Sequence, residues 1–180
     1  MYGIVNKSIE ELITSQFGIE VWKEVKKKSG VTIDYFLSNE AYDDSITYQL
    51  ATAASEILKI TVGEVLIVFG EWWILDTCNK KYRGMMASAG DTLGMFLLNL
   101  PRFHDRTQLM YPKLTPPEFR VEQIEKNRMH VSYISKRPGL QEFVRGLLQG
   151  LGKLFQESTA IQLIKSREVG DEYEIFEVSW

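Results

Sequence analysis

The sequence of 180 residues has few of the side chains that build metal clusters or covalent cross-links. Its one cysteine, Cys78, can form no internal disulfide and cannot by itself assemble a cysteine-based zinc or iron–sulfur centre. No uninterrupted apolar run is long enough to cross a bilayer, and no run of like charges exceeds Lys26–Lys28. These absences argue against a disulfide-rich secreted domain, a membrane protein and a nucleic-acid-binding protein, and they favour the reducing cytoplasm.

What is present is the composition of an ordinary globular protein, with 44% hydrophobic and 25% charged residues and a net charge of -3. A chain of this length buries about two-thirds of its unfolded surface without cross-links. Because the sequence has no internal repeat, low-complexity segment or convincing linker, we expect a single domain over residues 1–180.

The hydrophobic pattern predicts a helical first part and a mixed second part. Apolar residues recur at helical spacing through the first hundred residues, and Thr61 with Glu64 forms a capping box. After Pro116-Pro117 the pattern alternates as in strands. The fold class is therefore α+β, with a small antiparallel four-stranded sheet and a buried helix in the C-terminal part. We expect strands at Phe119–Ile124, Met129–Ser135, Ala160–Lys165 and Glu172–Trp180, and helices at Thr92–Met110, kinked or restarted at Pro101, and after Pro138-Gly139.

Only two histidines are present, so each can be weighed. His104 lies near Phe103 on a stretch with a helical pattern, where its simplest role is that of a surface or capping residue. An imidazole there could also bind a haem iron and leave the opposite axial position for a gas. His130 falls on a predicted strand with the opposite parity to Tyr133, so we expect it to face away and to be structural or exposed.

Tyr133, Ser135 and Arg137 form a second group, because alternate residues of a strand project from one face. All three donate hydrogen bonds, and a guanidinium can hold a carboxylate with two parallel bonds. Their simplest role is the polar outer face of a hairpin; the alternative is the grip on the two carboxylates of a porphyrin. Pro116-Pro117 either shapes a loop or presses a rigid ring against a flat ligand.

The order of these groups resembles the haem–nitric oxide/oxygen-binding (H-NOX) family, which is related to the sensor domain of soluble guanylate cyclase. His104 is followed by Pro117 and then by Tyr133-Ile134-Ser135-Lys136-Arg137, which matches the family's Tyr-x-Ser-x-Arg motif. The likeness is greatest to stand-alone bacterial members and covers nearly the whole chain. It includes Met1-Tyr2-Gly3, the Phe69-Gly70 pair before two tryptophans, and the run from Gly146 to Gly150.

The resemblance implies that haem b lies between the helical and the mixed parts. It implies that His104 binds ferrous iron, that Tyr133, Ser135 and Arg137 fix the propionates, and that Pro117 presses on the porphyrin and distorts it. Nitric oxide would weaken the iron–His104 bond, and release of the histidine would move its helix. The output would pass to a separate signalling protein: a histidine kinase, a cyclic-di-GMP enzyme, a guanylate-cyclase-like protein or a chemotaxis protein.

The resemblance also bears on which gas binds. Oxygen-binding members have a distal tyrosine whose hydrogen bond is worth about 1.5–3 kcal/mol. The matching position here is Phe143, and the positions of the supporting polar residues are Ile9 and Trp73. Phe143 and Ile9 have no donor; Trp73 has an indole N–H and could be an exception, although we expect its bulk to fill the pocket. We therefore expect nitric oxide and carbon monoxide to bind and oxygen to be largely excluded.

Two other functions fit parts of the sequence. One is a haem enzyme with peroxidase-like activity, although the expected apolar distal wall lacks the acid–base groups that cleave an O–O bond. The other is a haem-free interaction module that kept the fold, although a scaffold has no need of His104 together with the Tyr-x-Ser-x-Arg motif. The sequence has no phosphate-binding Gly-Lys loop, so we predict a sensor and not an enzyme.

Overall fold

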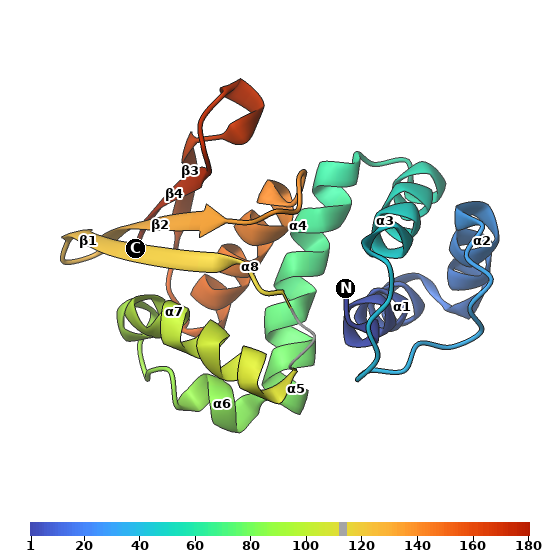
Figure 1. Ribbon diagram of the computed structural model, residues 1–180, viewed down its shortest axis with the longest axis horizontal. Coiled ribbons are helices and arrows are strands. Elements are labelled where there is room, and N and C mark those ends of the chain that lie inside the picture. The colour runs from blue at the N-terminus through green and yellow to red at the C-terminus, as the bar shows by residue number, and fades with distance from the viewer. Residues whose placement is uncertain (112–114) are drawn as a thin grey trace. The chain divides into compact units, whose positions relative to one another are not determined.

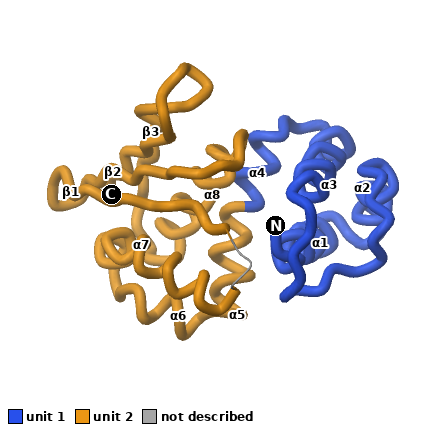
Figure 2. Tube along the Cα trace, viewed as in Figure 1, with its two compact units in different colours: residues 1–69 blue, residues 70–180 orange. Residues whose placement is uncertain are grey.

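The computed structural model describes residues 1–111 and 115–180 (Figure 1). The chain divides into two compact units, residues 1–69 and 70–180 (Figure 2). The boundary falls between Phe69 and Gly70, inside helix α4 (Val62–Trp72). In the described part of the chain, no helix combines the length and the apolar character that a membrane span requires.

Unit 1 consists of helices α1 (Gly3–Phe17), α2 (Ile19–Ser29), α3 (Asp44–Leu58) and the start of α4. Gly18, whose φ of 91° suits glycine, separates the first two helices. The capping box that opens α4 is present, because the Thr61 amide donates to the Glu64 carboxylate (2.7 Å) and the Glu64 amide donates to the Thr61 hydroxyl (3.2 Å). The core of this unit consists of apolar side chains from all four helices, among them Leu12, Ile13, Trp22, Val25, Leu50, Ala54, Leu66 and Phe69.

Unit 2 begins with a widened helical segment. Helix α4 passes into a π-helix, η1 (Trp73–Cys78), and then into two short helices, α5 (Asn79–Lys81) and α6 (Arg83–Ala87). π-helical turns are rare and occur mostly at functional sites. The sequence predicted continuous helical periodicity here and gave no sign of the extra residue in the turn.

The longest helix, α7 (Leu93–Met110), continues through Pro101. We expected a kink or a restart, because proline removes one backbone donor and clashes with the preceding turn. A restart does not occur. The residues on the inner face before the proline, Phe96, Leu97 and Leu100, are buried, and their packing supports a helix that continues past Pro101. Thr92 caps the N-terminus by accepting a hydrogen bond from the Met95 amide (3.3 Å).

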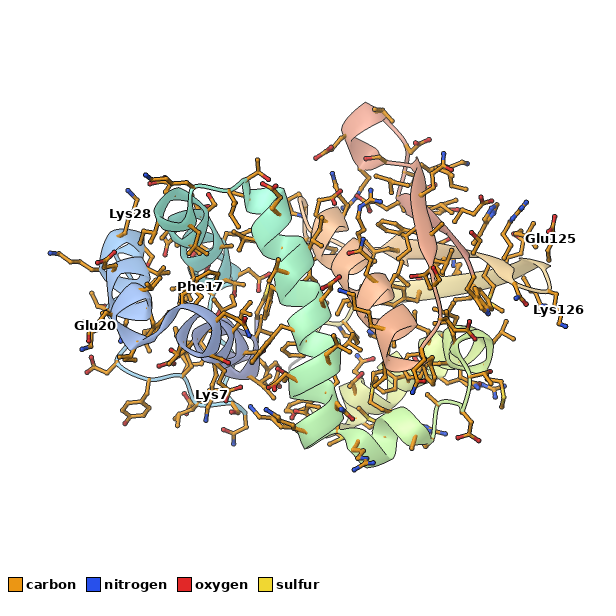
Figure 3. All side chains as sticks on the ribbon, turned by 180° about the vertical axis from the view of Figure 1, so that it is seen from behind. Lys7, Phe17, Glu20, Lys28, Glu125 and Lys126 are labelled. Atoms are coloured by element: carbon orange, nitrogen blue, oxygen red, sulfur yellow. The ribbon has the colours of Figure 1, made fainter. Side chains whose placement is uncertain are left out.

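A four-stranded antiparallel sheet has the order β1-β2-β4-β3, with β1 Glu118–Glu125, β2 Arg128–Ile134, β3 Ala160–Lys165 and β4 Glu174–Ser179. Glu125 and Lys126 lie at the tip of the β1–β2 hairpin (Figure 3). A 3₁₀ turn, η2 (Arg167–Val169), and Gly170 connect β3 to β4. The α+β class and the small four-stranded sheet are therefore confirmed.

Helix α8 (Gln141–Leu154) is almost entirely enclosed, as its apolar pattern predicted, with only Lys153 exposed. It contacts β3 and β4 as well as η1, while α7 lies next to β1 (Figure 1). Glycines allow α8 to approach the preceding helical segments closely. A Cβ added at Gly150 would lie 2.9 Å from the Ile74 Cβ, and one at Gly70 would lie 2.7 Å from the Leu147 amide nitrogen.

The substitution Gly70→Ala is expected to lower the free energy of unfolding by about 1–3 kcal/mol, because the new methyl group would collide with the backbone of α8. Gly84, on α6, is the matched control because a Cβ there meets no atom within 4 Å. Gly84→Ala should stabilise the protein by about 0.5–1 kcal/mol. Urea denaturation measures both changes, and equal effects of the two substitutions would contradict the close packing of α4 on α8.

Candidate functional site

His104 lies on the inner side of α7, half-buried, with its ring held by the helix itself. Its Nδ1 is 3.0 Å from the carbonyl oxygen of Leu100, one turn earlier. Because a carbonyl can only accept, this contact places the proton on Nδ1 and leaves the lone pair on Nε2. Burial lowers the pKa of His104, against the smaller opposing effects of the Leu100 carbonyl and Asp105. The imidazole is therefore neutral at pH 7, which is the form that binds a metal.

A cavity of about 60 Å³ lies beside this ring. Its walls come from η1, α6, α7, β1 and α8 and are apolar apart from His104, the Trp73 indole and the Cys78 thiol. The lining residues are Trp73, Ile74, Cys78, Met86, Phe96, Leu100, Phe103, His104, Phe119, Val144, Leu147, Leu148 and Leu151. The π-helix supplies three of them, so the widened turn shapes one wall of the cavity.

A row of aromatic rings connects His104 to the predicted polar motif. The His104 ring centroid lies 4.6 Å from that of Phe119, and the Phe119 centroid lies 5.5 Å from that of Tyr133. Phe119 and Tyr133 are direct partners across β1 and β2, so the sheet register sets this spacing. The structure therefore places the imidazole and the motif around one buried phenylalanine.

The Tyr-x-Ser-x-Arg motif lies partly beyond the sheet. Tyr133 is a buried strand residue, but β2 ends at Ile134, so Ser135 and Arg137 lie in a bend and not on the predicted strand face. The bend is closed by the Arg137 amide, which donates to the Ser135 hydroxyl (3.1 Å). Such serine turns are common where a chain leaves regular structure. Strand alternation alone would therefore have misplaced two of the three side chains.

The turn nevertheless gathers the three side chains. Burial raises the pKa of the Tyr133 hydroxyl, while its hydrogen bond with Ser135 and the positive charges of Arg167 and Arg137 act in the opposite direction. The phenol is therefore protonated at neutral pH and can donate. The Arg137 guanidinium donates to the Thr115 carbonyl (2.7 Å) and thereby reaches the segment that carries the two prolines.

Pro117 directly precedes β1 and is half-buried. It lies two residues before Phe119, whose ring contacts His104, so it stands at the same end of the strand as the imidazole. The residues on both sides of Pro117 are held by hydrogen bonds. Before it, the Thr115 carbonyl accepts one from Arg137, and after it, the pairing of β1 with β2 begins at Glu118. Pro117 is thus part of a fixed backbone segment.

The three predicted distal residues belong to two different units of the chain. Trp73 lines the same cavity as His104. Phe143 is half-buried on α8, one turn before Leu147, which does line that cavity. Ile9 belongs to unit 1, where it lines a separate apolar cavity with residues that include Leu12 and Phe69.

The two remaining candidates have ordinary surroundings. His130 lies on the opposite face of β2 from Tyr133, as strand parity predicted, and its Nε2 is 3.1 Å from the Glu177 carboxylate. Cys78 is buried, and burial raises the pKa of its thiol to about 12, so it is not a reactive thiolate.

Several residues that build the site were not singled out from the sequence. Leu100 and Phe119 could have been found, because one precedes His104 by a helical turn and the other begins the predicted strand. Arg167, in the connection between β3 and β4, and Glu174, the first residue of β4, carry no local signal. Their contact with it depends on the sheet order, which places β4 beside β2.

The donor set fits a haem. The His104 imidazole lines an apolar cavity, and hydrogen-bond donors gather where the row of aromatic rings ends, which suits a flat apolar ring with two carboxylates at one edge. The cavity is smaller than the roughly 300–1,000 Å³ of typical small-molecule sites, so its walls must separate to admit a porphyrin.

Comparison with solved structures defines the class of fold. An H-NOX protein from S. oneidensis, solved in the Fe(II)NO ligation state, superimposes with a TM-score of 0.89 at 19% identity, covering 99% of this chain and 98% of that one. An unliganded Fe(II) H-NOX protein from K. algicida gives a TM-score of 0.86 at 22% identity, covering 99% and 96%. The fold is the H-NOX fold.

The chain belongs to the family described as Haem-NO-binding, whose model matches residues 2–163. Soluble guanylate cyclase gcy-31 of Caenorhabditis elegans is 28% identical over 165 residues, and soluble guanylate cyclase 89Da of Drosophila melanogaster is 22% identical over 155 residues. The matches cover 91% and 86% of this chain but only 24% and 23% of the relatives, so the chain spans about a quarter of their length. The family consists of haem-based gas sensors, and the matched region is a sensor domain and not a catalytic one.

Proposed function

We propose that residues 1–180 form one sensor domain that holds haem b through His104 and binds nitric oxide and carbon monoxide while largely excluding oxygen. The observation that carries the proposal is the state of the imidazole. The Leu100 carbonyl fixes its Nδ1, and its Nε2 carries the lone pair beside an apolar cavity. A second hydrogen bond of this kind orients almost every histidine that binds a metal.

The haem would supply the iron atom to which a diatomic gas binds. Tyr133, Ser135 and Arg137 would hold its two carboxylates, which are costly to bury without donors. The phenol, the hydroxyl and the guanidinium offer three kinds of donor, and the sheet register keeps the Tyr133 phenol one phenylalanine away from His104. Pro117, at the start of β1, would set the position of the ring from its side of the cavity.

The side chains that would face the gas favour ligands that need no hydrogen bond. Phe143 and Ile9 offer none, and the Trp73 indole belongs to an apolar wall. Oxygen bound to iron gains more from a donor than nitric oxide or carbon monoxide does, by about 1.5–3 kcal/mol for a bond to a charged group. An apolar wall therefore discriminates against oxygen.

The position of His104 suggests how a signal leaves the site. The imidazole belongs to α7, a helix of 18 residues that contacts β1, so a change at Nε2 bears on the whole helix. Two positions of α7 with different gas affinity would form a switch. The receiver would be a separate signalling protein, of the kinase, cyclic-di-GMP, cyclase or chemotaxis type, which agrees with a match that covers only 24% of soluble guanylate cyclase gcy-31.

A peroxidase-like function has less support. Cleavage of an O–O bond requires a second acid–base group beside the iron. Within residues 1–111 and 115–180, His130 is the remaining histidine, and it pairs with Glu177 on the other face of β2.

Gas titration of the ferrous protein tests the proposed selectivity. We expect the visible absorption spectrum to change on addition of nitric oxide and carbon monoxide and to remain that of the unliganded ferrous form in air-equilibrated buffer, apart from slow oxidation. The apolar character of the wall predicts this result. A stable spectrum of an oxygen complex in air would contradict the proposed selectivity.

A further inference from the structure

An arginine in the connection between β3 and β4 holds the backbone of the Tyr-x-Ser-x-Arg segment. Arg167, the first residue of η2, donates from Nη1 to the Ser135 carbonyl (2.7 Å) and from Nη2 to the Arg137 carbonyl (3.1 Å). These two carbonyls belong to the residues whose side chains are proposed to bind the haem carboxylates. The Arg167 guanidinium therefore connects the two ends of the bend from which the Ser135 and Arg137 side chains extend.

A buried carboxylate keeps this guanidinium in place. The Arg167 Nε lies 2.8 and 2.9 Å from the two carboxylate oxygens of Glu174, whose residue is only 1% exposed. Glu174 is the direct partner of Tyr133 in the β2–β4 register, so the sheet fixes it beside the motif. A buried carboxylate without a partner is strongly unfavourable, so Arg167 is held on one side by charge and on the other by two carbonyls.

The turn that carries Arg167 is itself well defined. Ser166 caps it by accepting a hydrogen bond from the Glu168 amide (3.1 Å), and the Ser166 amide donates to the Asp171 carboxylate (2.8 Å). Gly170 closes the turn with a φ of 99°. The carbonyls of Ser135 and Arg137 are thus anchored to a hydrogen-bonded turn between β3 and β4, although β2 ends at Ile134.

We propose that Arg167, fixed by Glu174, is a positioning residue that sets the orientation of Ser135 and Arg137 toward the carboxylates of the bound haem. It acts through the backbone of the bend and does not itself touch the haem. The inference rests on the proposed function, in which Ser135 and Arg137 hold those carboxylates. The turn η2, which is distant from the motif in the sequence, would therefore orient Ser135 and Arg137 before the haem binds.

The first test compares Arg167→Gln with Arg145→Gln. Arg145 is a matched control, because it also pairs with a carboxylate, Glu142 (2.8 Å), and donates to a carbonyl, that of Ile161 (3.0 Å), but does not reach the motif. The rate of haem transfer to apomyoglobin should rise about tenfold in Arg167→Gln, as for loss of other supporting contacts around metal sites, and should change less than twofold in Arg145→Gln. Equal rates in the two variants would overturn the proposal.

The second test needs no haem. Amide hydrogen exchange of the haem-free full chain should become faster at Arg137, whose amide donates to Ser135, in Arg167→Gln and remain unchanged there in Arg145→Gln. Unchanged exchange in Arg167→Gln would overturn the positioning role even if the chain binds haem. Faster exchange in a chain that binds no haem would instead support the positioning of the bend and refute the proposed function.

A lysine in place of Arg167 distinguishes the effect of the positive charge from that of the two hydrogen bonds to the bend. Arg167→Lys keeps a positive charge beside Glu174 but lacks the planar fork that reaches both carbonyls. We expect it to restore most of the thermal stability lost in Arg167→Gln while haem transfer stays several-fold faster than in the native protein. Recovery of the native transfer rate would show that the charge alone suffices and would overturn the role assigned to the two hydrogen bonds.

Discussion

Replacing His104 with alanine is expected to weaken haem binding by about 100-fold or more. Loss of a supporting contact around a metal ligand typically costs 10–100-fold, and here the ligand itself is removed. The apolar walls and the Tyr133, Ser135 and Arg137 donors remain, so some non-specific haem binding should persist. Titration of the haem-free protein with hemin, followed at the Soret band, measures the change.

His130 provides the control, because it is the other histidine of the chain and pairs with Glu177 on the far face of β2. His130→Ala should bind haem as tightly as the native protein, within about twofold. Free imidazole should restore the native spectrum to His104→Gly, since it can occupy the space of the missing ring. Native affinity in His104→Ala would refute the assignment of the ligand.

The substitution Phe143→Tyr is expected to raise the affinity for oxygen by a factor of about ten to a hundred or more. The added hydroxyl would offer the hydrogen bond that Phe143 lacks, and bonds to charged partners contribute about 1.5–3 kcal/mol. Affinities for carbon monoxide, which gains little from a donor, should change much less. Equilibrium binding of both gases to the ferrous variant gives the ratio directly.

Phe155→Tyr serves as the matched control. Phe155 directly follows the same helix, its ring packs on Phe96 (5.7 Å between centroids), and it is not one of the residues proposed to face the gas. It should leave the affinity for oxygen unchanged. If Phe143→Tyr bound oxygen no better than Phe155→Tyr, Phe143 would not be the residue that faces the gas.

Much of the fold follows from local patterns. The capping box at Thr61 and Glu64, the strands around Phe119 and Met129 and the enclosed helix after Gly139 were all predicted, because each depends on side chains a few residues apart. The π-helix from Trp73 to Cys78 was not, because its extra residue is accommodated by packing against α8. The sequence also allowed a restart of the helix at Pro101. Helix α7 continues through this residue because its neighbours are buried, which the local pattern does not show.

The residues of the candidate site likewise fall into those that the sequence could predict and those that it could not. His104 and the motif could be chosen from the sequence because residue type and order carry the resemblance. The directions of Ser135 and Arg137 could not, since β2 ends before them and a serine turn replaces strand alternation. Arg167 and Glu174 were missed because their contacts with the motif span about 30 and 40 residues and exist only in the folded sheet.

The most direct test of the central claim is resonance Raman spectroscopy of the ferrous protein with ¹⁵N-labelled histidine. The imidazole of His104, with Nδ1 fixed by Leu100 and Nε2 carrying the lone pair, predicts an iron–histidine stretching band that shifts on labelling. The same band should be lost in His104→Ala and kept in His130→Ala. A preparation that takes up no haem, or a band that survives the removal of His104, would contradict the claim.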